Sequence, residues 1–253
     1  MSMSNPIFHV FPDADQLSRA AADEVAGAAE LAIAVCGRFT IALSGGSTPR
    51  RMFQLLAESP YRERIRWPRV EFFWGDERTV PPDHPDSNFR MANEALLHKL
   101  DIPACNLHRM QGERTDLAAA ARDYAAEIGR VFATSAGVPP SLDLVLLGMG
   151  PEGHTASLFP NTIALEQTSH WVVANHVQVK GTYRLTLTAP MINRAAQVMF
   201  LLAGADKAAI LAEVLEGPHD PQRLPSQLIR PTAGSLHFFL DQAAAAQLKR
   251  VKP

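Results

Sequence analysis

The sequence predicts an α/β protein in which βαβ units surround a mostly parallel sheet. Two observations predict it. Strand-like apolar runs alternate along the chain with Ala- and Leu-rich stretches of helical character, which is the order typical of parallel sheets. The apolar runs also end repeatedly in glycine-rich or polar segments, as strands do at the ligand-binding edge of an open sheet. Since 253 residues fit one large α/β domain, we expect a single domain over residues 1–253.

The elements follow in a regular order. A first helix is expected over residues 13 to about 37, because Leu17, Ala21, Val25 and Ala28 recur at helical spacing. Apolar runs bounded by turn residues indicate strands at residues 40–43, 70–74, 142–147, 171–174, 183–188, 198–203 and 236–240. Longer stretches between them indicate helices at residues 50–58, 88–100, 117–133 and 207–216, with a shorter one at 190–195. Proline-rich pieces at residues 81–85, 139–140 and 218–231 are expected to be loops, since proline lacks the N–H that helices and sheets use.

Composition and charge exclude several classes of partner. The net charge is −2, from 24 Lys and Arg against 26 Asp and Glu, and no basic run builds the positive face that nucleic acid or an anionic membrane requires. The first ten residues lack the features of a signal peptide, and no apolar run approaches the length of a bilayer span. Cys36 and Cys105 stand in no metal-binding or redox spacing. We expect a cytoplasmic protein that binds no metal, no nucleic acid and no membrane.

Four of the expected strands end in chemically unusual segments, at residues 44–49, 75–78, 148–154 and 204–207. In an open parallel sheet the carboxyl ends of the strands converge on one crevice. We therefore expect these four segments to line a common site.

The first of these segments, residues 44–49, reads Ser-Gly-Gly-Ser-Thr-Pro and has two interpretations. It is a capped turn in which Ser47 or Thr48 caps a helix and Pro49 suits the first helical position. Alternatively, the adjacent glycines, the hydroxyls and the helix N-terminus bind a phosphate, which is the interpretation we favour. Because no lysine follows the glycines as in a nucleoside-triphosphate loop, a monophosphate is indicated. The candidate phosphate-binding residues, with two cations that would complete the site, are Ser44, Gly45, Gly46, Ser47, Thr48, Arg184 and Lys207.

The second segment places Asp76, Glu77 and Arg78 directly after an aromatic strand, with a polar loop at residues 83–88 close behind. These charges are typical of helix caps and local ion pairs. They are equally consistent with a substrate site, because burying unpaired charges beside the strand is costly. Asp86 or Ser87 is expected to cap the helix that follows.

The third segment matches the dinucleotide fingerprint Gly-x-Gly-x-x-Gly at residues 148–153. That fingerprint requires an acidic residue at the end of the next strand to hold the ribose, and residues 171–175 contain none. We interpret the match as accidental. Glu152 and His154 instead form a candidate acid/base pair, because histidine titrates near neutrality and a carboxylate lies two residues away. No Gly-x-Ser-x-Gly or His-Glu-x-x-His motif offers a competing catalytic centre.

Taken together, residues 42–49, 73–78, 83–88, 147–160 and 184–188 resemble the 6-phosphogluconolactonase family, in the expected order and over nearly the whole chain. The Trp-Gly-Asp-Glu-Arg and Gly-His-Thr-Ala-Ser-Leu-Phe-Pro blocks are specific to it, whereas the Ser-Gly-Gly-Ser-Thr-Pro block is shared with glucosamine-6-phosphate deaminases. The resemblance implies a modified doubly wound, Rossmann-like, mostly parallel sheet flanked by helices, with a small additional subdomain or antiparallel strands.

The resemblance also implies an activity, the hydrolysis of 6-phosphogluconolactone to 6-phosphogluconate in the oxidative pentose phosphate pathway, without metal or organic cofactor. The expected partner is a small phosphorylated sugar lactone, bound by a monomer or weak homodimer. In this hypothesis His154 is the general base, Glu152 orients it and Arg78 stabilises the oxyanion, with Asp76 in the same candidate catalytic set. The family commonly has Asp where this chain has Glu152.

Two alternatives remain open at this point. A glucosamine-6-phosphate deaminase shares the phosphate loop, but its family continues after Gly-His toward Phe-Asn-Glu-Pro, whereas residues 157–160 contain no carboxylate. A sugar-phosphate-sensing domain of a transcription regulator requires a DNA-binding segment, and none is visible in the sequence.

Overall fold

The computed structural model describes residues 5–134 and 138–249 and contains two sheets. The main sheet has six strands in the order β1-β9-β8-β5-β2-β3, and every neighbouring pair is parallel. This confirms the mostly parallel sheet. Its strands are β1 (Ile7–Phe11), β2 (Phe39–Leu43), β3 (Val70–Trp74), β5 (Leu144–Leu147), β8 (Gln197–Leu202) and β9 (Ser235–Asp241).

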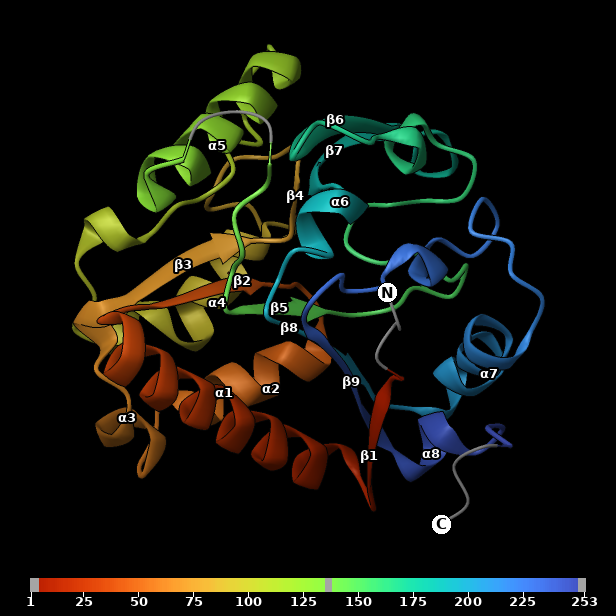
Figure 1. Cartoon of the computed structure of the whole chain (residues 1–253), viewed down its shortest axis with the longest axis horizontal. Helices are drawn as coiled ribbons and strands as arrows, with labels where there is room; N and C mark the ends of the chain where they lie inside the picture. The colour runs from red at the N-terminus through yellow and green to blue at the C-terminus, as the bar shows by residue number, and fades with distance from the viewer. Residues whose placement is uncertain (1–4, 135–137, 250–253) are drawn as a thin grey trace.

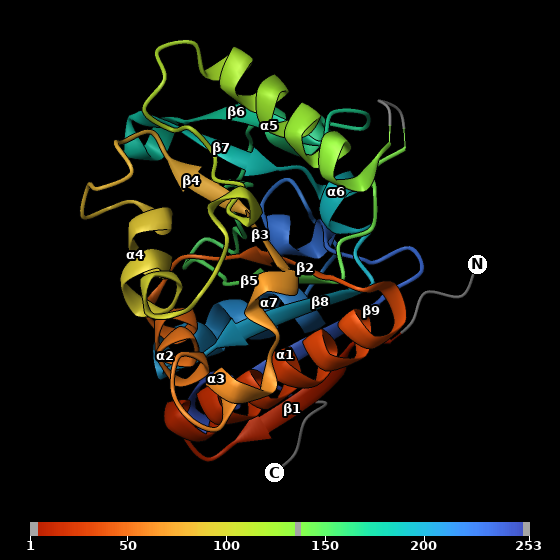
Figure 2. The ribbon, with the colours of Figure 1, turned by 90° about the vertical axis from the view of Figure 1, so that its left-hand side faces the viewer.

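The second sheet is antiparallel and has three strands in the order β4-β7-β6. It corresponds to the small addition of antiparallel strands that the family resemblance implied. The strands are β4 (Asp76–Arg78), β6 (Val172–Val177) and β7 (Thr182–Leu187). In Figures 1 and 2 this sheet lies above the main sheet, with α5 over it. The two sheets join through Gly75, whose N–H donates to the Leu43 carbonyl and whose carbonyl accepts from the Leu187 N–H.

Helices cover both sides of this arrangement, and α1 and α2 lie below the main sheet in both views (Figures 1 and 2). The α-helices are α1 (Ala14–Cys36), α2 (Ser47–Leu56), α3 (Tyr61–Arg64), α4 (Asn88–Ala95), α5 (Leu117–Phe132), α6 (Ala189–Ile192), α7 (Ala208–Glu216) and α8 (Gln242–Ala245). Short 3-10 turns occupy Trp67–Arg69, Leu97–Lys99, Ala104–Asn106, Ile163–Glu166, Gln178–Lys180, Ala205–Lys207 and Pro225–Leu228. In the part of the chain that the structure describes, no helix is long and apolar enough to cross a membrane.

Local chemistry accounts for the ends of α1. The Asp13 side chain accepts a hydrogen bond from the Gln16 N–H, and Gly37 ends the helix in the left-handed region at φ 78°. The side chains of Leu17 and Val25 are buried on one face, as the helical spacing predicted. The expected helix over residues 13–37 is therefore confirmed to within one residue at each end.

The structure differs from the expected elements at several places. β1 and β4 were not predicted, and the helix expected at residues 88–100 ends at Ala95 and gives way to a 3-10 turn. β4 has only three residues, all charged, and its strand conformation depends on pairing with β7. Apolar periodicity carries no signal for such a strand.

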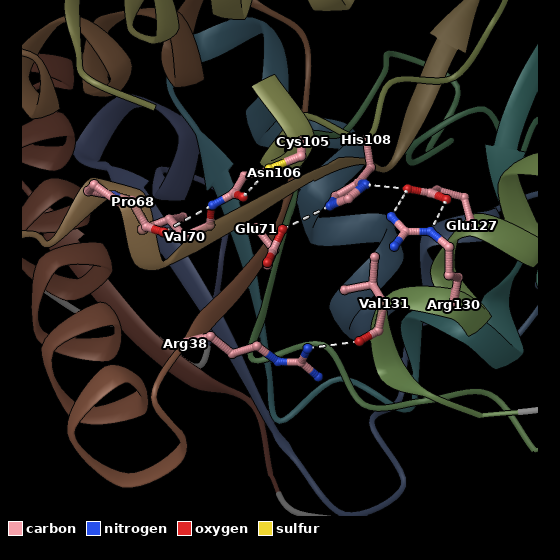
Figure 3. Close-up of polar contacts among 10 residues, drawn as sticks. All are labelled: Arg38, Pro68, Val70, Glu71, Cys105, Asn106, His108, Glu127, Arg130 and Val131. Atoms are coloured by element: carbon pink, nitrogen blue, oxygen red, sulfur yellow. Dashed lines mark hydrogen bonds and ion pairs between the residues drawn. The ribbon is translucent and has the colours of Figure 1, made fainter. Parts of the chain in front are cut away.

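A polar cluster ties α5 to the main sheet (Figure 3). His108 is 4% exposed, and its Nε2 lies 2.9 Å from Glu71 in β3 while its Nδ1 lies 2.7 Å from Glu127 in α5. Arg130 also donates to Glu127 through Nε, at 2.8 Å. The His108 ring therefore bridges the two carboxylates, and Arg130 adds a cation beside Glu127. The Arg130 and His108 hydrogen bonds lower the pKa of Glu127 to about 2, against the opposing effect of burial.

We expect Glu127→Gln to reduce the free energy of unfolding at pH 7 by about 1–2 kcal/mol, the usual loss for a partly exposed charge-assisted hydrogen bond. Because the folded-state pKa is depressed, this stability is present above the unfolded-state value of 4.5 and is lost as pH falls toward about 2. Urea unfolding of both proteins between pH 7 and pH 2 measures the difference. The exposed Glu58→Gln serves as control, and a constant difference across this range contradicts the prediction.

Candidate active site

The four polar strand-end segments meet around one cavity of about 220 Å³. Its walls come from residues 44–49 after β2, from β4, from residues 148–150 and 154–156 after β5, and from the end of β8. All four segments follow strands of the parallel sheet, namely β2, β3, β5 and β8, so their convergence is a consequence of strand direction. The candidate residues that line the cavity are Ser44, Gly45, Gly46, Ser47, Thr48, Asp76, Arg78, His154 and Lys207.

The loop after β2 brings an uncapped helix N-terminus to the cavity. Gly46 is the N-cap of α2, at φ 109°, and no side chain caps the helix. The expectation that Ser47 or Thr48 acts as the cap is wrong, because the turn at Gly46 makes them the first two helical residues. The first N–H groups of a helix lack intrahelical partners and favour an anion. An uncapped terminus that lines a cavity is therefore suited to a phosphate.

Two details of this loop also favour a ligand. Ser44 is 7% exposed, and its buried Oγ has no hydrogen-bond partner among the described residues. Buried hydroxyls without a partner are uncommon in folded proteins, and this one belongs to a residue of the cavity wall. Gly45 lies so close to Asn88 that a Cβ added there would be 2.0 Å from the Asn88 Oδ1. Only glycine permits this approach.

The three candidate cations occupy different positions. Lys207 lines the cavity at the end of a 3-10 turn, with its Nζ 3.0 Å from Asp206. Arg78 also lines the cavity, and its Nη1 donates to the Asp86 carbonyl. Arg184 lies opposite Arg78 in the pairing of β4 with β7 and is not among the residues of the cavity wall. Burial and the nearby Arg78 lower the pKa of Arg184.

His154 is held on several sides. Its Nδ1 lies 2.9 Å from the Glu152 Oε2, and its ring stacks on Phe159 with centroids 3.9 Å apart. The ring also lies against Gly150, where an added Cβ would be 1.8 Å from Cε1. Burial lowers the pKa of His154, and the hydrogen bond to Glu152 opposes that shift. A neutral ring that donates from Nδ1 to Glu152 leaves the Nε2 lone pair available to accept a proton.

The carboxylate of Glu152 reaches His154 despite its extra methylene. Burial opposes ionisation, but the backbone hydrogen bond, the bond to His154 and the nearby Lys180 lower the pKa of Glu152 overall. Its second oxygen, Oε1, lies 4.0 Å from the Lys180 Nζ. A glutamate at this position is therefore long enough to orient the ring.

The loop that carries His154 is not a dinucleotide site. After β5 the chain runs through turns, and its next helical element is the 3-10 turn Ile163–Glu166. A dinucleotide fingerprint places its pyrophosphate on the N-terminus of a helix that follows the glycines directly. Here the glycine-rich segment leads to His154 instead.

Comparison with known proteins identifies the family of the chain. A family described as glucosamine-6-phosphate isomerases/6-phosphogluconolactonase matches residues 12–238. The chain belongs to this family. It is 45% identical over 218 residues to a 6-phosphogluconolactonase of Synechocystis sp., covering 86% of this chain and 88% of that protein. It is 42% identical over 239 residues to one from Nostoc sp., covering 94% and 97% of the two chains.

A solved structure shows the same arrangement of elements. The 6-phosphogluconolactonase from Trypanosoma cruzi superimposes with a TM-score of 0.86 at 30% identity, over 98% of each chain. The resemblance inferred from the motifs is confirmed, and with it the modified doubly wound fold and the prediction that the chain is an enzyme of this family.

Sequence reasoning missed Asn88 as a residue of the cavity wall. Asn88 lines the cavity from the first position of α4, and Ser87 caps this helix by accepting from the Arg90 N–H. The buried Glu77 carboxylate accepts the N–H groups of Asn88 and Phe89. The Glu77 carboxylate therefore holds the start of α4 through two backbone N–H groups. The polar loop at residues 83–88 was the available signal, but it gave no indication that Asn88 would reach the cavity.

We expect Gly150→Ala to displace the His154 ring, because the new methyl would overlap it. Burial is the largest influence on this ring, so its pKa should rise toward the ordinary value of about 6.5 as it becomes more exposed. NMR titration of the ring protons measures the shift. Gly148→Ala is the matched control, because a Cβ there meets nothing within 4 Å. An unchanged titration in Gly150→Ala would contradict this account.

Proposed function

We propose that this chain hydrolyses 6-phosphogluconolactone to 6-phosphogluconate, the reaction of the oxidative pentose phosphate pathway to which its relatives' names refer. One observation carries the proposal. A single cavity holds an oriented His154 together with the uncapped N-terminus of α2 and Lys207. A phosphorylated substrate with a carbonyl to be attacked matches that combination of groups.

In the proposed mechanism His154 acts as the general base. Its Nε2 takes a proton from water while the water oxygen forms a bond to the lactone carbonyl carbon. Glu152 accepts the Nδ1–H at 2.9 Å, which fixes the ring and stabilises the imidazolium that forms. The lowered pKa of His154 keeps the ring in the neutral, proton-accepting form at neutral pH.

The carbonyl electrons move to oxygen and form a tetrahedral oxyanion. Arg78 lines the same cavity and supplies positive charge to that oxygen, together with backbone N–H donors. The intermediate collapses when the bond from carbon to the ring oxygen breaks. The ring oxygen leaves with the electron pair and takes the proton from His154, which restores the neutral base and yields the open acid.

The phosphate binds at the other side of the cavity in this proposal. The N–H groups at the start of α2 and the Ser44 hydroxyl donate to it, and Lys207 supplies charge. Arg184, beside the cavity and next to Arg78, contributes from the second sheet. Holding the phosphate fixes the distance of the carbonyl from His154, so binding energy is used for positioning.

A side-by-side assay separates this proposal from a deaminase, since the family name covers both activities. We expect accelerated hydrolysis of 6-phosphogluconolactone over the buffer rate, and no ammonia release from glucosamine 6-phosphate. His154→Ala should lower turnover by a factor of about 10² to 10⁴, typical of a lost general base. Ammonia release without lactone hydrolysis would overturn the proposal. Binding of the sugar phosphate without turnover would instead indicate a sensing module.

Removing the phosphate-site cations should affect only phosphorylated substrate. Arg184→Ala and Lys207→Ala should each raise KM for 6-phosphogluconolactone by roughly 10- to 100-fold, since a charge-assisted hydrogen bond is worth about 1.5–3 kcal/mol. Hydrolysis of unphosphorylated gluconolactone should stay unchanged in both variants. The exposed Lys99→Ala is the control, and equal losses on both substrates would refute the phosphate role.

A further inference from the structure

Ser157, three residues after His154, is hydrogen-bonded to all three strands of the second sheet. Its Oγ donates to the Asp76 Oδ2 at 2.7 Å, its N–H donates to the Thr186 Oγ1 at 3.2 Å, and its carbonyl accepts from the Asn175 Nδ2 at 2.9 Å. These three partners lie in β4, β7 and β6, one in each strand. All four side chains are buried, with exposures between 0% and 8%. The second sheet therefore holds this segment through one polar side chain per strand.

The segment between His154 and Ser157 is a tight turn fixed at both ends. Ala156 adopts φ 46°, and the Leu158 N–H donates back to the Thr155 carbonyl. At the other end the Thr155 Oγ1 donates to the Gly148 carbonyl at 2.8 Å. A displacement of Ser157 therefore moves the turn on which His154 stands.

The Asp76 carboxylate that holds Ser157 also contacts the opposite wall of the cavity. Its Oδ1 lies 3.2 Å from the Asn88 Nδ2, which also donates to the Asp76 carbonyl at 2.9 Å. The remaining amide atom, the Asn88 Oδ1, packs directly against Gly45. A chain of contacts thus runs from the loop of Gly45 through Asn88 and Asp76 to Ser157.

We propose that Asp76, Ser157 and Asn88 are positioning residues, which fix the distance between the phosphate loop and His154. This inference rests on the proposed function. Both oxygens of Asp76 already accept hydrogen bonds from the protein, so its role is to join the two walls rather than to exchange protons with the substrate. In an enzyme that grips the phosphate, a displacement of about 1 Å at the reacting end costs about 10² in rate.

The proposal predicts a loss that depends on the substrate. Ser157→Ala removes one hydroxyl and leaves Asp76 and His154 in place. We expect kcat/KM for 6-phosphogluconolactone to fall about 10- to 100-fold, mainly in kcat, because the bound phosphate prevents the carbonyl from following His154. Unphosphorylated gluconolactone has no bound phosphate and can shift together with a displaced His154, so its kcat/KM should fall no more than about 3-fold. A merely structural loss would reduce both substrates equally.

The matched control is Ser226→Ala. Ser226 is a buried serine whose Oγ has no partner among the described residues, and it lies outside the cavity wall. The substitution deletes a serine hydroxyl without breaking a hydrogen bond of that side chain, so both substrates should be turned over at the wild-type rate.

Asn88→Ala tests the link from its other end and is available should Ser157→Ala fold poorly. It should show the same selective loss for the phosphorylated lactone. The double variant should lose about as much as the more severe single variant, because each substitution breaks the same chain of contacts. Thermal unfolding confirms that each variant is folded before its kinetics are compared.

The outcomes separate the two proposals. If 6-phosphogluconolactone is hydrolysed no faster with the wild-type protein than in buffer alone, the proposed function is wrong. Three results with an active wild-type protein overturn only the positioning role. The Ser157→Ala and Asn88→Ala variants lose activity on both substrates equally, they lose activity on neither, or their losses add in the double variant.

Discussion

The site depends on the parallel pairing of β2, β5 and β8. Ala42 pairs with Val145, and Val145 pairs with Val198, so the three strands run in register and end at the same edge. The segments that follow them are far apart in the sequence, and strand direction alone delivers them to one cavity. The loop after β2, the turn that carries His154, and Lys207 owe their proximity to this pairing.

The second sheet supplies what the parallel sheet lacks. Directly after β3 the chain passes through Gly75, which is hydrogen-bonded to β2 on one side and to β7 on the other. This connection places Asp76 and Arg78 in the wall of the cavity. Arg78, Asp76 and His154 thereby line the same cavity.

Local signals were sufficient wherever an element is stabilised by its own residues. The helix from Ala14 to Cys36 has its cap at Asp13 and its stop at Gly37, within one residue of the bounds that apolar spacing predicted. They were insufficient for β4, whose three charged residues form a strand only against β7. The cap of α2 was misassigned, since Gly46 takes the cap position at φ 109° and makes Ser47 and Thr48 helical residues.

By itself the sequence determined most of the strands and helices, the family and the chemical groups at the strand ends, because periodicity, glycine content and motif spacing are properties of neighbouring residues. Only the tertiary structure decided how those groups meet. It placed Arg184 beside the cavity, brought Asn88 into its wall and buried Ser157 against Asp76, 81 residues away along the chain. A buried polar side chain must find a partner wherever the fold provides one, and motif spacing contains no information about that partner.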